Sequence, residues 1–329
     1  MTPTRRLAGL GIATAALLAL AACSSAPTPP TDPGNPLTAA GPVTASDLTG
    51  RSISLDAPAE RVVCLDGTCI DALAELDLVP VASTQMEQVH HPLFFGPDVE
   101  VTALGGSFFE PDLEGILAAE PDLVIGSESV HGAIAASLGD VAFYGNALTS
   151  VDEAPENLRR IAVLTGREDA AEAAIERYEK TLADYRPGTR ATSVLSMYGG
   201  ATADIGIDAG DSTIGELLGR YTSYPWPKAS ESESGFLEIG LDTILDGDPA
   251  HIWILDFGFD PSAEPLVDQL AKERLWTALT AVSTGNVHLA DASWWGRTGG
   301  TRGQQAILDT VLPAVYPEEF PAPLSALAG

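Results

Sequence analysis

The stretch RVVCLDGTCIDALAEL, residues 61–76, decides the fold class of this chain. It opens with two valines, which favour a strand, and passes through a short polar turn. Apolar residues then recur at helical spacing, at Ile70, Leu73, Ala74 and Leu76. A strand that leads directly into a helix is the building unit of parallel α/β sheets, so we expect an α/β fold. Cys64 and Cys69 flank the turn, where two thiols suit a metal site, redox chemistry or a disulfide.

The N-terminus predicts export and a lipid anchor. Arg5 and Arg6 precede an apolar run, residues 7–22, that is shorter than the ~20 residues of a membrane-spanning helix. The run ends in small residues directly before Cys23, which resembles the lipobox of bacterial lipoproteins. We therefore expect residues 1–22 to be a signal peptide and Cys23 to carry lipid on the outer face of the cell membrane. A signal peptide cleaved near Ala22 without lipidation is the alternative.

The composition of residues 23–45 predicts a disordered tether. The segment is rich in Pro, Ser and Thr and nearly free of large apolar side chains. Such a segment buries too little apolar surface to fold, so it would hold the folded part away from the membrane.

The cysteine count favours a disulfide in the turn. Of three cysteines, Cys23 is assigned to lipid, which leaves Cys64 and Cys69 as a pair in an oxidising compartment. A metal site would need further ligands, and none lies nearby in sequence. Redox pairs usually have the tighter C-x-x-C spacing. We predict a Cys64–Cys69 disulfide that closes a small loop and has a modest effect on global stability.

The charge of the chain is strongly negative, with 46 acidic against 17 basic residues and a formal net charge of −29 at pH 7. Nucleic acids and anionic lipid surfaces are therefore poor partners. Solubility of an exposed surface explains most of this charge. A bound ligand is more easily neutral or cationic than strongly anionic, unless its pocket is locally basic.

Two α/β lobes are expected. Apolar strand patterns alternate with helical patterns in residues 46–150 and again in residues 189–329. Residues 151–188 carry a helical pattern long enough to bridge the lobes, with Gly166 as a candidate break and a Pro-Gly pair at its end. The fold predicted is two Rossmann-like lobes with parallel-rich sheets, joined by one long helix.

Five segments resemble the siderophore and cobalamin class of substrate-binding proteins of ABC transporters. They are RVVCLDGTCIDALAELDLVPVAST (61–84), EPDLEGILAAEPDLVIGS (110–127), FLEIGLDTILDGDPAHIWIL (236–255), LWTALTAVSTGNVHLAD (275–291) and WWGRTGGTRGQQAILDTVL (294–312). Asp77 stands where a glycine is common in the family. The Trp-Trp-Gly stretch at 294–296 is most similar to ferric-siderophore binders, so the resemblance implies an extracytoplasmic protein that binds an iron(III)-siderophore, with no cofactor and no catalysis.

The resemblance also implies a ligand cleft between the lobes, at the carboxyl ends of the strands. It places the turn after the first strand on the cleft wall, so Asp66, Gly67 and Thr68 are expected to face the ligand. The disulfide would then hold this turn in one shape before binding, or act only as a stabilising clip.

A bulky, partly apolar chelate calls for aromatic walls and a few polar groups. The aromatic candidates are Phe108, Phe109, Tyr198, Trp294 and Trp295. Neighbours in a strand alternate, so we expect one of the two tryptophans to be exposed. Arg297 and Arg302 are the basic candidates, since a guanidinium can donate to negative oxygens around the metal, although each also suits an ordinary surface ion pair.

Family members dock on their permease through one acidic residue on each lobe. Glu114 in DLEGIL matches the first position, and Asp242 in GLDTIL matches the second, where glutamate is more usual. Glu238 is the fallback for the second. The partners implied are a permease with its ATPase and a ferric-siderophore, bound by a monomer.

Alternative ligands and functions stay open at this point. Haem would need axial ligands, for which His91 and Tyr198 are candidates, and cobalamin is a further possibility within the class. A secreted serine hydrolase built on Ser212 in a GDS sequence is the alternative from a different class, but no G-x-S-x-G sequence is present. A structural lipoprotein without a ligand is the third.

Overall fold

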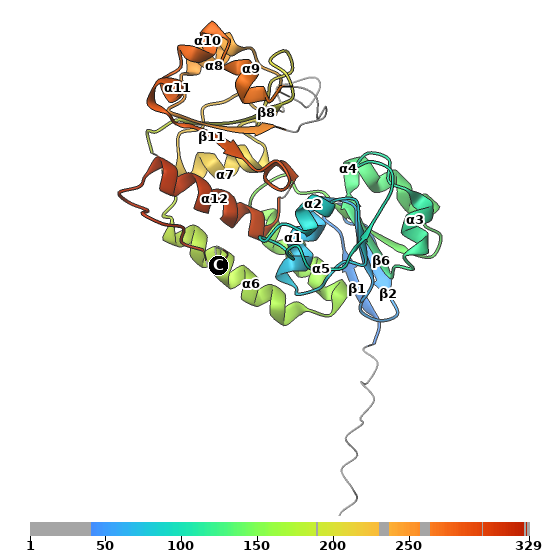
Figure 1. The fold of residues 1–329 in the computed structure, drawn as a ribbon. Coiled ribbons are helices and arrows are strands. Elements are labelled where there is room, and N and C mark those ends of the chain that lie inside the picture. Colours follow the sequence, from blue (N-terminus) through green and yellow to red (C-terminus); the bar gives the residue numbers. More distant parts are fainter. Residues whose placement is uncertain are drawn as a thin grey trace, which may run out of the picture. The chain divides into compact units, whose positions relative to one another are not determined.

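The computed structural model of the protein describes residues 41–188, 190–229, 237–256, 264–297, 299–325 and 327 (Figure 1). The predicted signal peptide, Cys23 and most of the predicted tether lie outside these residues. Ala40–Gly329 form one compact unit. Within the described ranges, no helix combines the length and the apolar character needed to cross a membrane.

The N-terminal lobe is built on a five-stranded sheet in the order β5-β4-β3-β6-β7. All neighbouring strands in it are parallel. Its strands are β3 (Val62–Cys64), β4 (Ala82–Ser83), β5 (Thr102–Ala103), β6 (Leu123–Ser127) and β7 (Ala142–Asn146). Its helices are α1 (Gly67–Glu75), α2 (Met86–Val89), α3 (Leu113–Ala118), α4 (Glu128–His131) and the 3₁₀ helix η1 (Gly132–Ser137). Because the strands are parallel, all five carboxyl ends lie along one edge.

A small hairpin precedes this sheet and corrects the predicted tether. β1 (Val43–Ser46) pairs antiparallel with β2 (Ser52–Leu55), so the ordered chain starts before the predicted boundary at residue 45. Ile53 on β2 is buried, which gives the hairpin its apolar face. The composition of residues 23–45 did not predict this strand, because β1 is stabilised by its pairing with β2 and its packing against α5.

Two helices occupy the predicted connecting segment. α5 (Glu153–Thr165) ends at Gly166, and α6 (Glu168–Asp184) follows. Gly166 has φ 65°, a left-handed conformation that glycine adopts at little cost, and its N–H closes the last turn of α5. The single predicted helix is therefore two helices, and the break falls at the candidate position.

The C-terminal lobe has a four-stranded sheet in the order β11-β10-β8-β9. β8 (Val194–Gly199), β10 (His251–Asp256) and β11 (Val287–Ala290) are parallel, and β9 (Gly206–Ile207) is antiparallel to β8. The helices are α7 (Thr213–Tyr221), α8 (Leu241–Gly247), α9 (Leu266–Leu270), α10 (Arg274–Thr277), α11 (Thr280–Thr284), the 3₁₀ helix η3 (Trp295–Arg297) and α12 (Thr301–Val315). The predicted two-lobed α/β fold with parallel-rich sheets is confirmed.

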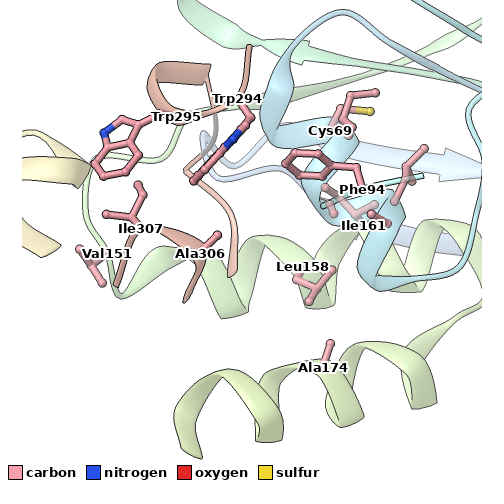
Figure 2. Close-up of a cluster of buried hydrophobic side chains, with 14 of the residues drawn as sticks. Cys69, Phe94, Val151, Leu158, Ile161, Ala174, Trp294, Trp295, Ala306 and Ile307 are labelled. Atoms are coloured by element: carbon pink, nitrogen blue, oxygen red, sulfur yellow. The ribbon is translucent and has the colours of Figure 1, made fainter. Parts of the chain in front are cut away.

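Helix α12 ties the two lobes together. It packs against α6, α1 and α7 (Figure 1). One buried cluster runs through this region and includes Ile70 of α1, Leu158 of α5, Trp295 and Ile307. Figure 2 shows Trp295 and Ile307 near Val151, with Leu158 and Cys69 further along the same cluster. The two lobes therefore share a hydrophobic core around α12.

Charged side chains reinforce this junction. The carboxylate of Glu75, at the end of α1, is buried and accepts from Arg177 of α6 at 2.9 Å. The other oxygen of Glu75 lies 3.3 Å from the guanidinium of Arg302 on α12. A buried carboxylate needs such partners, because its desolvation is otherwise costly.

Candidate functional site

The carboxyl edges of the two sheets contact each other, and this contact defines the candidate site. The guanidinium of Arg297, which follows β11, donates to the side-chain oxygen of Gln85, which follows β4, at 2.9 Å. The N–H of Gly299 points to the hydroxyl of Thr68 at 3.4 Å. A Cβ added at Gly67 would lie 2.3 Å from the carbonyl oxygen of Arg297, so this approach requires glycine. The contact between the lobes therefore lies where parallel α/β sheets usually place ligands.

The turn after β3 is held by a disulfide and by side-chain hydrogen bonds. The structure links Cys64 and Cys69 by a disulfide whose Cα atoms are 5.5 Å apart. Asp66 caps α1 by accepting from the N–H of Cys69 at 2.8 Å, and the Asn146 side chain donates to both of its carboxylate oxygens. Burial raises the pKa of the Asp66 carboxyl, and the bonds from Asn146 and Cys69 oppose the rise.

This arrangement differs from the predicted exposure of the turn. Asp66 is only 6% exposed, so it serves inside the lobe rather than on the cleft wall. It is turned inward because an N-cap side chain must fold back onto its own helix. Gly67 is buried too, and of the three predicted residues only Thr68 keeps some exposure.

Two phenylalanines project from the loop after β5. Phe109 is 72% exposed, and its ring packs edge-on against Phe108 with centroids 5.1 Å apart. Phe108 in turn packs edge-on against the ring of His131 at 5.1 Å. An exposed aromatic ring on a carboxyl-edge loop is free to contact a ligand.

His131 anchors this loop, and sequence reasoning missed it. The ring is almost fully buried, its Nδ1 accepts from the N–H of Ser127 at 3.0 Å, and its Nε2 lies 2.6 Å from the carbonyl oxygen of Phe108. Because Nδ1 accepts, Nε2 carries the proton and donates to Phe108. A lone histidine between a valine and a glycine gave no sequence signal for this role.

Trp294 and Trp295 are both buried, which corrects the prediction that one of them is exposed. Trp294 is 7% exposed and Trp295 is 0% exposed. They do not lie in a strand, because Trp294 sits in a turn and Trp295 begins η3, so the alternation rule does not apply. Trp295 stacks on Trp253 and Trp294 lies beside His91, with centroids 6.4 and 6.1 Å apart.

The two predicted arginines have different surroundings. Arg297 is half-buried at the facing edges, where it bonds to Gln85 and to the carbonyl of Ala292. Arg302 points away from them, toward Glu75 and the carbonyl oxygens of Leu93 and Ala74. The position of Arg302 inside α12 explains this, since its side chain lies over the junction with α1.

Tyr198 lies near the carboxyl end of β8 and covers Gly206 of β9, where a Cβ would meet its ring at 2.2 Å. Burial raises the pKa of its hydroxyl, and the Asp208 carboxylate adds to the rise. Asp208 was missed by sequence reasoning. It accepts from Ser196 at 2.6 Å, and burial raises the pKa of its carboxyl to about 6.

The predicted docking carboxylates are exposed. Glu114 lies in the first turn of α3 and Asp242 in the first turn of α8, one on each lobe. Glu238 is exposed as well, on the segment that bridges to Gly206 of β9. A carboxylate near a helix N-terminus is favoured there by the helix dipole.

A model of the periplasmic binding protein family matches residues 62–293, more than half of the chain. The chain belongs to this family. The Fe(3+)-citrate-binding protein YfmC of Bacillus subtilis is 26% identical over 266 residues, which cover 78% of this chain and 81% of YfmC. The Fe(3+) dicitrate-binding periplasmic protein FecB of Escherichia coli is 24% identical over 269 residues, which cover 79% of this chain and 86% of FecB. A cobalamin-binding protein of Halobacterium salinarum is 26% identical over 292 residues, 84% of this chain and 77% of that protein.

The fold is also found in solved structures. The triscatecholate siderophore binding protein FeuA of Bacillus subtilis, solved with ferri-bacillibactin, superposes with a TM-score of 0.67 at 17% identity. The match covers 83% of this chain and 97% of FeuA. The predicted resemblance to this class of proteins is confirmed.

The competing chemistries have little support in the geometry. His91 uses both ring nitrogens, since Nδ1 accepts from the N–H of Leu93 and Nε2 lies 3.4 Å from Asp291, so it is a poor axial haem ligand. Ser212 caps α7 by accepting from the N–H of Gly215 at 3.0 Å, which is a structural role. In the described part of the chain, no three His, Cys, Asp or Glu side chains are grouped to hold a metal ion.

Proposed function

We propose that this protein captures a ferric siderophore outside the cytoplasmic membrane and delivers it to the permease of an ABC transporter. The observation that carries the proposal is the contact between two carboxyl edges, at Thr68, Gln85 and Arg297, in a member of the periplasmic binding protein family. The names of its relatives YfmC and FecB specify ferric citrate as ligand, which favours an iron chelate here. The protein binds and carries its ligand and performs no catalysis.

The ligand site lies between the lobes. Thr68 and Arg297 supply a hydroxyl and a guanidinium, and Phe109 supplies an exposed aromatic ring beside Phe108. Tyr198 contributes from the C-terminal lobe. The disulfide at the base of the first turn limits the order that is lost on binding, because the turn is already fixed.

The protein is anchored by lipid on Cys23 and acts as a monomer. Residues 24–42 then connect the anchor to the first strand of the folded part. Glu114 and Asp242 dock on the permease, one from each lobe, and the ATPase of the transporter acts beyond it.

Cobalamin is the second candidate ligand, favoured by the Halobacterium salinarum relative. It predicts the same cleft and the same docking residues, so only a binding measurement separates the two.

The test is a titration of protein that begins at residue 24 with ferric siderophores, haem and cobalamin, followed by tryptophan fluorescence and visible absorbance. We expect saturable quenching by at least one ferric siderophore, since Trp294 and Trp295 precede Arg297 by three and two residues in the chain. Binding of cobalamin alone would move the function to the second candidate. A Soret shift with haem alone, or no binding of any ligand, would overturn the proposal.

A further inference from the structure

The facing edges carry very little positive charge. Most of the described arginines and lysines pair with a carboxylate. Arg61 and Arg167 instead donate to backbone carbonyl oxygens at the opposite end of the N-terminal lobe. Three remain: Lys228, Arg274 and Arg297. Segments 230–236 and 257–263, outside the described residues, contain no lysine or arginine in their sequence. Within the described residues, the positive charge that is not already paired with a carboxylate and is available to a ligand therefore comes from these three side chains.

Only one of the three lies at the contact between the lobes. Arg274 begins α10, which packs on α8 and α11 in the C-terminal lobe, away from the N-terminal lobe (Figure 1). Lys228 is exposed on a segment held to Gly210 and Asp211, where the N–H of its neighbour Ala229 donates to the Asp211 carboxylate at 2.6 Å. Arg297 remains, and it already donates to two neutral oxygens.

Carboxylates at the same edges offset this single charge. Asp291 follows β11 and its side chain is 49% exposed, and among the residues that the structure describes its ion-pair partner is His91 at 3.4 Å. Asp204, between β8 and β9, is exposed. A ligand at these edges therefore meets a field that is neutral or negative, inside a protein of net charge −29.

We propose that the ligand is a ferric chelate without net negative charge, of the tris-hydroxamate class. This inference rests on the proposed function and specifies its ligand. Three hydroxamates balance the charge of Fe³⁺ and leave a neutral complex, whereas three catecholates leave three negative charges. An anionic chelate would lose its hydration at a site with one guanidinium, which costs free energy that one positive charge does not offset. The carboxylates of Asp291 and Asp204 would also repel it, so the site disfavours anionic chelates. The aromatic rings of Phe108 and Phe109 suit a neutral, partly apolar chelate.

The probes for the test cover a range of charge: the hydroxamates ferrichrome (neutral) and ferrioxamine B (positive), ferric dicitrate (negative) and the catecholate ferric enterobactin (three negative charges). We expect ferrichrome or ferrioxamine B to bind at least about tenfold more tightly than both anionic chelates. We also expect the Kd of ferrichrome to change by less than about twofold between ~0.05 and ~0.5 M salt, because a neutral chelate forms no strong ion pair on binding. Tighter binding of ferric enterobactin or ferric dicitrate would overturn the inference while leaving the proposed function intact. If none of the four binds, the proposed function itself fails.

A pair of charge-matched variants sharpens the test. Arg297→Gln removes a hydrogen-bond donor at the facing edges, and we expect it to raise the Kd of the neutral chelate about tenfold with the salt dependence still flat. Arg274→Gln makes the same charge change on α10 and should leave the Kd within about twofold. Thermal unfolding of both variants checks that they are folded. A steep salt dependence that disappears only in Arg297→Gln would show an anionic ligand and overturn the inference.

Discussion

At the scale of single residues, the protein keeps several ionisable groups inside, each with specific partners. Asp208 accepts from Ser196, Asp66 accepts from Asn146 and Cys69, and His131 bridges Ser127 and Phe108. Each of these groups holds neighbouring backbone or side chains in place through short hydrogen bonds. Because burial raises the pKa of the Asp208 carboxyl and of the Asp66 carboxyl, the protonation of these two groups couples to stability.

Asp208 predicts a pH dependence of stability. Its pKa is raised to about 6, whereas the unfolded chain has the ordinary value near 4, so the folded state binds the proton more tightly. The stability that this group contributes is full below about pH 4 and is lost as the pH rises through about 6. We expect Asp208→Asn to raise the free energy of unfolding at pH 7 by about 2 kcal/mol, with little effect at pH 4. Urea unfolding at both pH values measures this, and an equal gain at the two values would contradict it.

The contacts of His131 predict that it affects ligand binding through Phe109. In His131→Phe the ring remains, but the N–H of Ser127 loses its acceptor and the carbonyl of Phe108 loses its donor, which should cost about 1–3 kcal/mol of stability. The Phe108–Phe109 loop then loses its anchor, so the Kd for the chelate should rise. Phe109→Ala should raise the Kd without affecting stability, because the ring is exposed.

The double variant decides whether these residues act together. If His131 acts on the ligand by positioning Phe109, the double variant His131→Phe, Phe109→Ala should have a Kd no higher than that of the single variant with the higher Kd. Fully additive losses of binding free energy would show that His131 affects the ligand by another route.

At the scale of elements, much of the architecture was predictable from local patterns, and the exceptions have physical causes. The strand and helix at residues 61–76 were recognised because β-branched residues and helical spacing reflect local propensity. The break at Gly166 was a candidate for the same reason, since glycine favours a left-handed helix end. β1 was missed because its stability comes from pairing with β2, which no local pattern reveals.

The candidate site was less predictable than the fold. Arg297 and Phe109 were selected as residue types that suit a chelate; Arg297 lies at the contact between the lobes, and Phe109 is exposed on the loop after β5. The inward orientation of Asp66 and the burial of both tryptophans depend on tertiary contacts, with Asn146 and with Trp253. Gln85 and His131 gave no signal because their partners lie far away in sequence.

The start of α12 gives a prediction about an element. Gly300, its N-cap, has no side chain to cap the helix, and Asp71 of α1 accepts instead from the N–H groups of Arg302 at 3.1 Å and Gly303 at 2.7 Å. One lobe thus caps a helix that packs on the other. We expect Asp71→Ala to lower the free energy of unfolding by at least about 1–2 kcal/mol, since a cap is lost and buried N–H groups are left unsatisfied.

Urea unfolding measures this loss. Asp98→Ala, on an exposed loop, is the matched control and should change stability by less than about 0.5 kcal/mol. If the two variants were equally stable, α12 would not depend on the cap from α1.

At the scale of the whole molecule, the fold separates two tasks. The proposed ligand site lies where the carboxyl edges of the two sheets meet, whereas Glu114 and Asp242 are exposed at the starts of helices on separate lobes. A permease that contacts both carboxylates would sense how the lobes are arranged. Binding and delivery should therefore be separable by mutation.

We expect Glu114→Ala and Asp242→Ala together to abolish uptake of the ferric chelate by cells while leaving its Kd within about twofold, because both side chains are exposed in the first turns of helices and neither belongs to the contact made by Thr68, Gln85 and Arg297. Each single variant should reduce uptake in part, since one lobe still docks. Glu238→Ala separates the two candidates on the C-terminal lobe, and normal uptake in this variant would assign the contact to Asp242. Uptake of labelled iron and titration of the purified variants measure the two properties side by side. Normal uptake by the double variant would show that the permease recognises another surface, and a weakened Kd would show that these carboxylates contribute to the ligand site instead.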